Sequence, residues 1–473
     1  MKTRVQPPRP SVPVLRFLGA TETVTGSRFL LDTPRSRVLI DCGLYQGLKP
    51  LRLRNWEGLP IPPASIDAVV LSHAHLDHSG YLPALVRDGF RGQVFCTPAT
   101  KELCGIVLPD SGRVQEEDAA YANRKGFSKH SPALPLYTEA DAVQALSALR
   151  VVDFGTLAEV APDVGLVFHR AGHILGSAIV EVRVGGMHGR VIVFSGDLGR
   201  PHHPILRPPA GRPTCDVLLV ESTYGDRLHE DVASLERFRD AIRRTAARGG
   251  MVVIPSFAVD RTEVVLYHLR CMMAASEVPR LPVWVDSPMA LATLAIYRRA
   301  LAEGSQEVHP GISSGGDPFD PGQLVEARTP EQSMAINAER GPGIVISASG
   351  MATGGRVLHH LLHRLPDARN TVVLVGFQAE GTRGRALLEG ARQIKLLGRY
   401  VAVAAEVVDV PAFSVHADRN ELIGWLRTNQ RPPDTTYIVH GEPVAARGLR
   451  DAIQDTLGWN AVVPRYLETV RVD

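Results

Sequence analysis

The chain is poor in several features that mark particular classes of protein. It has five cysteines in 473 residues, an odd number with no CxxC pair: Cys42, Cys96, Cys104, Cys215 and Cys271. Such scattered thiols fit buried free cysteines in a reducing compartment. The chain has no apolar run of the roughly 18 residues that a membrane span needs. Prolines interrupt the N-terminal segment MKTRVQPPRPSVP, where a signal peptide would be apolar. We therefore expect a cytoplasmic protein without membrane contact.

Excess charge is also absent. Lys and Arg number 52 and Asp and Glu number 50, so the net charge of +2 does not by itself indicate a nucleic-acid-binding protein. Only six of the 52 basic residues are lysines, which reflects either guanidinium groups that hold phosphates or a coding bias toward arginine. The apolar fraction of 44% is that of a soluble globular protein, and the length predicts two cores, one of which can be inserted in the other.

Two patterns of secondary structure follow each other along the chain. From residue 14 to about 195, short strand-like runs are separated by turn residues, with a helix predicted over 98–124. After a proline-rich stretch at 201–213, strand-like runs alternate with amphipathic helices. This alternation predicts a mostly parallel sheet with helices on both faces. From about residue 400, strand signals return with one helix near 420–428.

Two local expectations belong to the middle of the chain. Asp260, with Glu263 three residues later, has the pattern of a capping box at a helix start. The segment 304–333 is polar and rich in glycine and proline, so we expect a long loop there.

Potential metal ligands are concentrated in the segment HAHLDH (73–78). Four of its six positions carry such side chains: His73, His75, Asp77 and His78. They follow the strand-like run DAVVLS, so a tight turn can point several of them the same way. A lone histidine is more often a hydrogen-bonded core or surface residue, but four ligands at this density favour a metal site.

Three further candidates stand at the ends of later or earlier apolar runs: Asp41, His173 and Asp197. A carboxylate at the end of a buried strand costs free energy unless it is paired or bound to a metal. Imidazole and carboxylate ligands suit zinc, and also iron or manganese. Six or seven ligands are too many for one tetrahedral zinc, whereas two metals about 3.5–4 Å apart would use them all. We expect two Zn²⁺ per chain, with Mn²⁺ or Fe²⁺ as alternatives.

These residues resemble the HxHxDH signature of the metallo-β-lactamase fold. Four downstream motifs resemble, in order, those of the β-CASP nucleases, which include RNase J and the endonuclease subunit of the cleavage and polyadenylation machinery: ESTYG (221–225), SASGMATGGR (347–356), FSVHAD (413–418) and IVHGE (438–442). The resemblance covers nearly the whole chain from Val14 and corresponds to the short bacterial and archaeal forms without an extra C-terminal domain.

The resemblance implies an α/β fold, a metallo-β-lactamase αββα sandwich with an inserted β-CASP domain. The domains expected from it are a flexible lead-in at 1–13, the first part of the metallo-β-lactamase domain at 14–204, the β-CASP domain at 205–396 and the C-terminal part of the metallo-β-lactamase domain at 397–473.

The resemblance also implies a role for each site residue. One zinc would be held by His73, His75 and His173. The second would be held by Asp77, His78 and His440, with Asp197 bridging the two. Asp41 would orient a ligand histidine. His416 is the candidate general acid supported by Glu221, and Asp77 is also a candidate acceptor of a proton from the attacking water.

The reaction implied is hydrolysis of RNA phosphodiesters to 5′-phosphate and 3′-hydroxyl ends. His440 favours single-stranded RNA as the substrate, because RNA-processing members of the family carry histidine at this motif whereas the DNA-repair branch typically carries valine. Endonuclease action is expected, and 5′-to-3′ exonuclease action stays open.

The glycine-rich motif is not a Walker A loop, but it joins a predicted strand to a helix, where backbone amides can hold a phosphate. Together with the GTRGR segment (381–385), it predicts an RNA phosphate-binding set: Ser349, Gly350, Met351, Thr353, Gly354, Gly355, Arg356, Thr382 and Arg383.

Other functions stay open at this point. A metallo-β-lactamase-fold hydrolase of thioesters, lactones or β-lactams would have no use for Glu221, His416 and the glycine-rich loop together. A flavin-dependent di-iron oxidoreductase would need an appended flavodoxin-like domain. An inactive RNA-binding paralogue would have lost metal ligands that this chain retains. A homodimer is compatible with each of these functions.

Four other histidines are expected to have no chemical role. His359 and His363 are four residues apart on a predicted helix, but no third ligand is evident, so we expect surface residues. His202 and His203 lie in the proline-rich stretch and are expected to be solvated.

Overall fold

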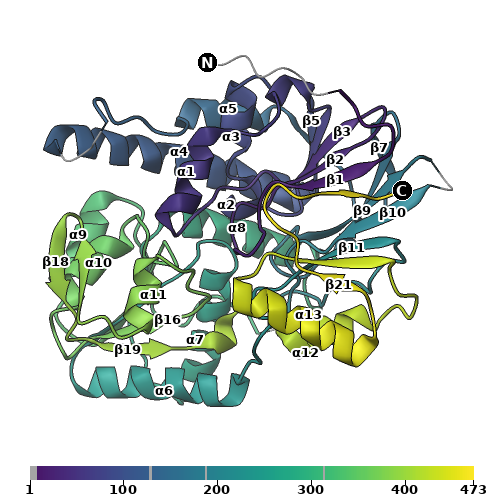
Figure 1. Cartoon of the computed structure of the whole chain (residues 1–473). Helices are drawn as coiled ribbons and strands as arrows, with labels where there is room; N and C mark the ends of the chain where they lie inside the picture. Colours follow the sequence, from purple (N-terminus) through teal and green to yellow (C-terminus); the bar gives the residue numbers. More distant parts are fainter. Residues whose placement is uncertain (1–7, 127–129, 187–188, 313–314) are drawn as a thin grey trace. The chain divides into compact units, whose positions relative to one another are not determined.

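The computed structural model describes residues 8–126, 130–186, 189–312 and 315–473. The chain divides into two compact units (Figure 1). The first, which we call the sandwich unit, comprises Met1–Leu228 and His416–Asp473, and the second, the insertion unit, comprises His229–Val415. Within the described ranges, no helix is long and apolar enough to cross a membrane.

The sandwich unit contains most of the strands. They are β1 (Val14–Phe17), β2 (Phe29–Asp32), β3 (Arg37–Ile40), β4 (Ala68–Val70), β5 (Gln93–Cys96), β6 (Leu149–Val151), β7 (Ala158–Ala161), β8 (Val164–Arg170), β9 (Ala178–Val184), β10 (Arg190–Phe194), β11 (Val217–Glu221), β20 (Thr435–Val439), β21 (Ala461–Val462) and β22 (Thr469–Arg471). Its helices are α1 (Lys49–Glu57), η1 (Pro63–Ser65), α2 (Leu76–Ser79), α3 (Leu82–Arg87), α4 (Pro98–Lys125), α5 (Glu139–Leu146), α12 (Arg419–Leu426) and α13 (Pro443–Leu457).

These strands form two seven-stranded sheets, with the orders β22-β1-β2-β3-β4-β5-β6 and β21-β20-β11-β10-β9-β8-β7. The inner faces meet in one apolar core, to which Phe17, Ile40 and Phe168 contribute. α12 and α13 lie beside the second sheet (Figure 1), and their Leu422 and Leu449 pack in a separate cluster. The result is the expected αββα sandwich.

The insertion unit is built around a six-stranded sheet. Its strands are β12 (Met251–Pro255), β13 (Val283–Val285), β14 (Leu324–Glu326), β15 (Gly343–Ser347), β16 (Thr371–Leu374) and β19 (Glu406–Asp409), beside a two-stranded sheet of β17 (Gln393–Leu396) and β18 (Arg399–Ala402). Its helices are α6 (Asp231–Ala247), α7 (Arg261–Ala274), α8 (Pro288–Ala302), α9 (Pro330–Ala338), α10 (Val357–Arg364), α11 (Arg383–Leu388) and η2 (Pro411–Phe413). Every pairing in the larger sheet is parallel, as the alternation of strands and helices predicted.

Local sequence accounts for the bounds of several helices. α4 begins where the Thr97 side chain accepts a hydrogen bond from the backbone N–H of Thr100, and it ends at Gly126, which has a left-handed φ of 64°. This helix confirms the one predicted over 98–124. The capping box expected at Asp260 is wrong: Asp260 has a φ of 68° and forms no side-chain cap to α7.

The unit boundaries differ from the expected domain bounds of 205 and 396. The segment up to Leu228 belongs to the sandwich because β11 hydrogen-bonds between β10 and β20. The segment up to Val415 belongs to the insertion because β19 pairs with β16. Side-chain periodicity cannot show which sheet a strand joins.

Further differences are local. The expected loop at 304–333 contains β14 and the start of α9. Residues 1–7 of the expected lead-in lie outside the described residues, whereas Arg9 forms an ion pair with Asp67 at 3.0 Å. His203 is buried, contrary to expectation, because its Nδ1 accepts hydrogen bonds from the N–H groups of Ile205 and Leu206. Four of the five cysteines are buried and free, and Cys271 is exposed.

Candidate metal centre and acid–base pair

The predicted metal and acid–base residues all lie in the sandwich unit, and all but His416, which precedes α12, lie at or beside the ends of its strands. Asp41 follows β3, the HAHLDH segment follows β4 and runs into α2, and His173 follows β8. In the second sheet, Asp197 follows β10, Glu221 is the last residue of β11, and His440 follows β20. Since β10, β11 and β20 are parallel neighbours, their C-terminal ends meet at one edge of the sheet and bring these side chains together.

The first group of ligand atoms comprises His73, His75, His173 and Asp197. His75 Nδ1 lies 3.1 Å from His73 Nε2 and 3.2 Å from His173 Nε2. Asp197 Oδ2 lies 3.5 Å from His73 Nε2 and 3.6 Å from His173 Nε2. Three imidazoles and one carboxylate oxygen therefore converge on a common point.

The second group comprises Asp77, His78 and His440. His440 Nε2 lies 3.1 Å from His78 Nε2 and 3.4 Å from Asp77 Oδ2. Asp197 reaches this group with its other oxygen, since Oδ1 lies 3.2 Å from His78 Nε2. The two carboxylate oxygens of Asp197 thus face different groups, which is the arrangement of a bridging ligand.

The spacing of these atoms fits a pair of zinc ions. A tetrahedral zinc with Zn–N distances of about 2.0–2.1 Å separates adjacent ligand atoms by about 3.3 Å. The separations given for these atoms are 3.1–3.6 Å, close to that value, while His78 Nε2 lies 4.0 Å from Asp77 Oδ2. The donor set of imidazoles and carboxylates is also the one that zinc accepts.

Burial and neighbouring charges shift the pKa values of the cluster in different directions in the first and second groups. Burial, and then the neighbouring His78, lower the pKa of His73 well below its ordinary value, and burial lowers the pKa of His75 to about 4. Burial would raise the pKa of Asp197, but the charges of His440 and His78 outweigh it and hold that pKa well below its ordinary value. In the first group, neutral His73 and His75 therefore face an ionised carboxylate. In the second group, burial opposes protonation of His440, but the charge of Asp197 and the hydrogen bond to Asp77 raise its pKa above the ordinary value.

Asp41 holds His78 in place. Its Oδ2 lies 2.8 Å from His78 Nδ1, and it accepts hydrogen bonds from the backbone N–H and the hydroxyl of Ser72 at 2.7 and 2.8 Å. Burial opposes protonation of His78, but Asp197 and Asp41 outweigh it and raise the pKa of His78 well above its ordinary value. Because Asp41 contacts Nδ1, Nε2 of His78 points into the second group. Carboxylates commonly orient metal-binding histidines in this way.

The sequence did not reveal two other supporting residues. Ser72 lies between Asp41 and His73, with its Oγ 3.1 Å from His73 Nδ1. Thr223 Oγ1 lies 3.1 Å from His440 Nδ1. Ser72 ends the strand-like run DAVVLS and Thr223 lies within ESTYG, and these positions were the available signal. Asp41 and His440 have left-handed φ values of 58° and 51°, and non-glycine residues keep such strained backbones mainly at functional sites.

Glu221 and His416 form a pair beside the metal ligands. Glu221 is fully buried, and its Oε1 lies 3.3 Å from His416 Nδ1. The same carboxylate accepts hydrogen bonds from the backbone N–H groups of Leu198 at 2.7 Å and Thr223 at 3.3 Å, which fix its orientation. The His416 side chain is 15% exposed, and its Nδ1 lies 4.0 Å from Asp197 Oδ2. The pair can therefore present one imidazole nitrogen, held by a carboxylate, next to the metal cluster.

The residues of the predicted phosphate-binding set lie together in the insertion unit, in the loop from β15 to α10 and at the start of α11. The Gly384 N–H donates to Met351 O at 3.0 Å, which joins the two segments. Ser349 Oγ and Thr353 Oγ1 lie 3.0 Å apart. Gly350 is enclosed, since a Cβ there would lie 2.5 Å from the ring of Phe257.

The two arginines of this set are engaged within the unit. Arg356 donates to Asp286 at 2.7 Å and to Ala327 O at 3.1 Å. Arg383 donates to Ala352 O at 3.1 Å and to Thr353 O at 2.9 Å. Both guanidinium groups therefore hold the loop in shape.

A second buried cluster supports this loop and was missed in the sequence. Asp286 also accepts hydrogen bonds from Ser333 at 2.5 Å and lies 2.6 Å from Nε2 of His360, which is fully buried. By contrast, His359 and His363 are exposed, as expected. Burial would raise the pKa of Asp286, but the hydrogen bonds from His360, Ser333 and Arg356 lower it.

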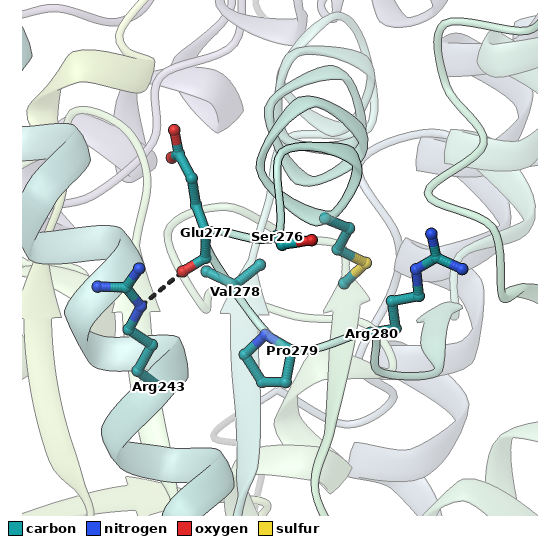
Figure 2. A pocket seen from close by; sticks show the side chains of 7 residues that line it. Arg243, Ser276, Glu277, Val278, Pro279 and Arg280 are labelled. Atoms are coloured by element: carbon teal, nitrogen blue, oxygen red, sulfur yellow. Dashed lines mark hydrogen bonds between the residues drawn. The ribbon is translucent and has the colours of Figure 1, made fainter.

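The insertion unit also has a hollow of about 410 Å³ between the end of α6 and residues 276–280 (Figure 2). Arg243 lies at its edge and donates to the carbonyl of Glu277 at 2.5 Å. The hollow contains none of the predicted site residues, so it is not part of the metal cluster.

Comparison with known protein families and proteins agrees with this geometry. The Beta-lactamase superfamily domain matches residues 36–253, the Beta-Casp domain matches 262–387, and the Zn-dependent metallo-hydrolase RNA specificity domain matches 400–464. The chain is 39% identical over 425 residues to Ribonuclease TTHA0252 of Thermus thermophilus, covering 90% of this chain and 92% of that protein.

Two archaeal relatives are similar over nearly all of this chain. Transcription termination factor FttA of Methanocaldococcus jannaschii is 31% identical, and that of Methanosarcina mazei is 32% identical; each similarity covers 96% of this chain and 71% of the relative. With three matching domains in order and a relative similar over almost its full length, the chain belongs to the β-CASP family of metallo-β-lactamase-fold hydrolases.

Proposed function

We propose that this protein is a zinc-dependent ribonuclease that cuts single-stranded RNA internally and leaves 5′-phosphate and 3′-hydroxyl ends. The matching RNA specificity domain and the relative named as a ribonuclease support RNA as the substrate. The observation that carries the proposal is the Glu221–His416 pair beside two ligand groups that share Asp197. Stepwise 5′-to-3′ degradation is a second mode, which the assay below distinguishes.

His73, His75 and His173 would hold one zinc, Asp77, His78 and His440 the other, and Asp197 would be shared. When bound, two zinc ions supply an activated water nucleophile at neutral pH and neutralise charge that develops on the phosphate. Asp41 keeps His78 in the orientation that this arrangement needs.

His416 is assigned as the general acid. With Nδ1–H donated to Glu221, Nε2 carries the proton that the leaving ribose oxygen requires. A thioester or an activated lactone has a better leaving group and would not need this pair. The pair therefore favours a phosphodiester over those alternative substrates.

Asp77 is assigned first as a ligand. Burial opposes its ionisation, but the hydrogen bond from His440 and the charge of His78 lower its pKa below the ordinary value. A carboxylate with a lowered pKa binds a metal well and accepts a proton weakly. Its role as acceptor of a proton from the water is therefore secondary.

Phosphate binding by the glycine-rich loop would fall to hydroxyl and backbone N–H groups, because Arg356 is engaged by Asp286 and Arg383 by carbonyls of the loop. Ser349 and Thr353 are the accessible hydroxyl residues of this set. The loop therefore stays a proposed RNA-binding element of the insertion unit, in which hydroxyl and N–H groups contact phosphates and the two arginines support the loop.

The test incubates the purified protein with RNA labelled at the 5′ end or the 3′ end, with and without zinc chelator. Internal products with 5′-phosphate ends that disappear with chelator are expected, and release of mononucleotides from the 5′ end would indicate the exonuclease mode. Intact RNA alongside turnover of a thioester or lactone would overturn the proposal. Binding of RNA without cleavage at any metal concentration would indicate an inactive paralogue.

Two accompanying expectations are a cytoplasmic location and a homodimer. Cell fractionation tests the first, and sedimentation velocity of the purified protein tests the second.

A further inference from the structure

The outer face of α1 combines cationic and apolar side chains that are exposed together. With 3.6 residues per turn, successive side chains are about 100° apart, so Arg52, Trp56, Lys49 and Leu53 follow one another around roughly a third of the helix. Trp56 is 58% exposed and Leu53 is 49% exposed, and Lys49 and Arg52 are exposed as well. We define the outer face of α1 as these four residues.

The charges on this face are available to a ligand. Across the described ranges of the chain, the side chains of Lys49 and Arg52 form no hydrogen bond or ion pair. Glu57, at the edge of the face, is the acidic residue of the helix. The face therefore attracts anions and not cations.

The opposite side of α1 is held firmly. Asn55 is buried, accepts a hydrogen bond from Tyr45 N at 3.0 Å and donates to Tyr45 O at 2.8 Å. The guanidinium of Arg54 lies 3.9 Å from the ring centroid of Tyr466 and 5.4 Å from that of Tyr45. Arg28, itself buried, donates to Asn55 at 3.2 Å. The helix is thus a rigid support, and its exposed tryptophan is not the result of loose packing.

The same segment leads from the metal cluster to α1. Residues 41–48 join Asp41 to the helix, and along them the N–H groups of Cys42 and Leu44 donate to the carbonyls of His78 and Leu76, both at 2.7 Å. The outer face of α1 therefore belongs to the unit that holds the ligands and is connected to them through hydrogen-bonded backbone.

We propose that the outer face of α1 is a binding platform for single-stranded RNA, on which a base stacks on Trp56 while Lys49 and Arg52 contact phosphates. An exposed aromatic ring flanked by cations is the combination that sequence-tolerant binding of single strands uses. Scattered exposed apolar residues need no explanation, but a tryptophan and a leucine on one helical face with two unpaired cations mark an interaction surface. The unpaired positive charges favour an anionic partner such as RNA. This inference rests on the proposed ribonuclease function and adds to it a site for substrate away from the metal ligands.

The test measures KM and kcat with a single-stranded RNA of roughly 20 nucleotides, and, in parallel, hydrolysis of bis(p-nitrophenyl) phosphate, which is too small to use a platform. Trp56→Ala is expected to raise KM for the RNA roughly 5- to 100-fold, the range found for loss of one base–aromatic stack. Trp56→Phe retains a ring and is expected to retain most of the affinity. Arg52→Ala should reduce the slope of log affinity against log salt by about 1. All variants should hydrolyse the small diester at the wild-type rate.

Matched controls separate this effect from general surface changes. Leu157→Ala removes an apolar side chain that is also 58% exposed in the sandwich unit, and Arg124→Glu reverses a charge at the exposed end of α4; neither should change KM. If Trp56→Ala and Arg52→Ala both keep the wild-type KM, the proposed RNA platform is wrong, and a protein becomes the better candidate for the partner of this face. If the wild-type protein does not cleave RNA, the proposed function fails, and fluorescence anisotropy with the same intact RNA and variants then decides the platform by itself.

Discussion

Replacement of His416 by glutamine tests the assignment of the acid most directly. The change removes the proton donor while keeping a polar side chain near Glu221, whose carboxylate stays fixed by the N–H groups of Leu198 and Thr223. Glu221→Gln would be a less clean change, because the amide could accept only one of those two hydrogen bonds through its single oxygen and would disturb the backbone at the ligands.

The expected size of the effect follows from what His416 does. Loss of a positioned general acid lowers a rate by about 10²- to 10⁴-fold, or roughly 3–5 kcal/mol of barrier. Metal content should be unchanged, because the two ligand groups are complete without His416. Bis(p-nitrophenyl) phosphate has a leaving group that departs without protonation, so its hydrolysis should remain within a few-fold of wild type.

The assay is single-turnover cleavage of labelled RNA beside hydrolysis of the small diester, with zinc measured by mass spectrometry on the same samples. A large loss on RNA alone is the signature of a missing acid. Equal losses on both substrates, or a loss of zinc, would refute the assignment and place His416 among the groups that hold the metals.

Three other predictions concern the ligands and the insertion unit. Asp41→Asn should weaken zinc binding about 10- to 100-fold, since it loosens His78, and competition with a chromophoric chelator measures this. Asp197→Asn should release zinc from both groups, as its two oxygens face different groups, and a protein that keeps one full equivalent would contradict a shared ligand. Burial, and then Asp260, raise the pKa of Glu263 well above its ordinary value. The wild-type free energy of unfolding should therefore fall as pH rises from about 4.3, the ordinary value, toward the folded-state pKa, with a slope of at most about 1.4 kcal/mol per pH unit. Glu263→Gln should lack that slope in urea unfolding at pH 5 and pH 8, and an unchanged slope would show that Glu263 is ionised when folded.

The chemistry of the site was largely readable from the sequence because ligand type and local density are local properties. The segment 73–78 carries four ligands in six positions, and the apolar runs before Asp197 and Glu221 place carboxylates at strand ends. The parallel sheet of the insertion followed from the alternation of strands and helices for the same reason. Local patterns failed where the outcome depended on packing: Asp260 is not a cap, His203 is buried, and His360 is a core residue bound to Asp286.

Resemblance and local pattern together predicted which residues form the candidate metal centre. The sequence by itself could not show how these residues are arranged in two groups of ligands. The pairing of β11 between β10 and β20 brings Glu221, Asp197 and His440 to one edge, and only this packing directs the two oxygens of Asp197 toward different groups. The roles of Arg356 and Arg383 changed for the same reason, since their partners are carbonyls and a carboxylate supplied by other segments of the insertion unit. The sequence thus determined the kinds of ligand and the order of the elements, which depend on neighbours along the chain. The tertiary structure decided which candidate ligands lie together, which arginines are engaged and which face of α1 is exposed, because these depend on neighbours in space.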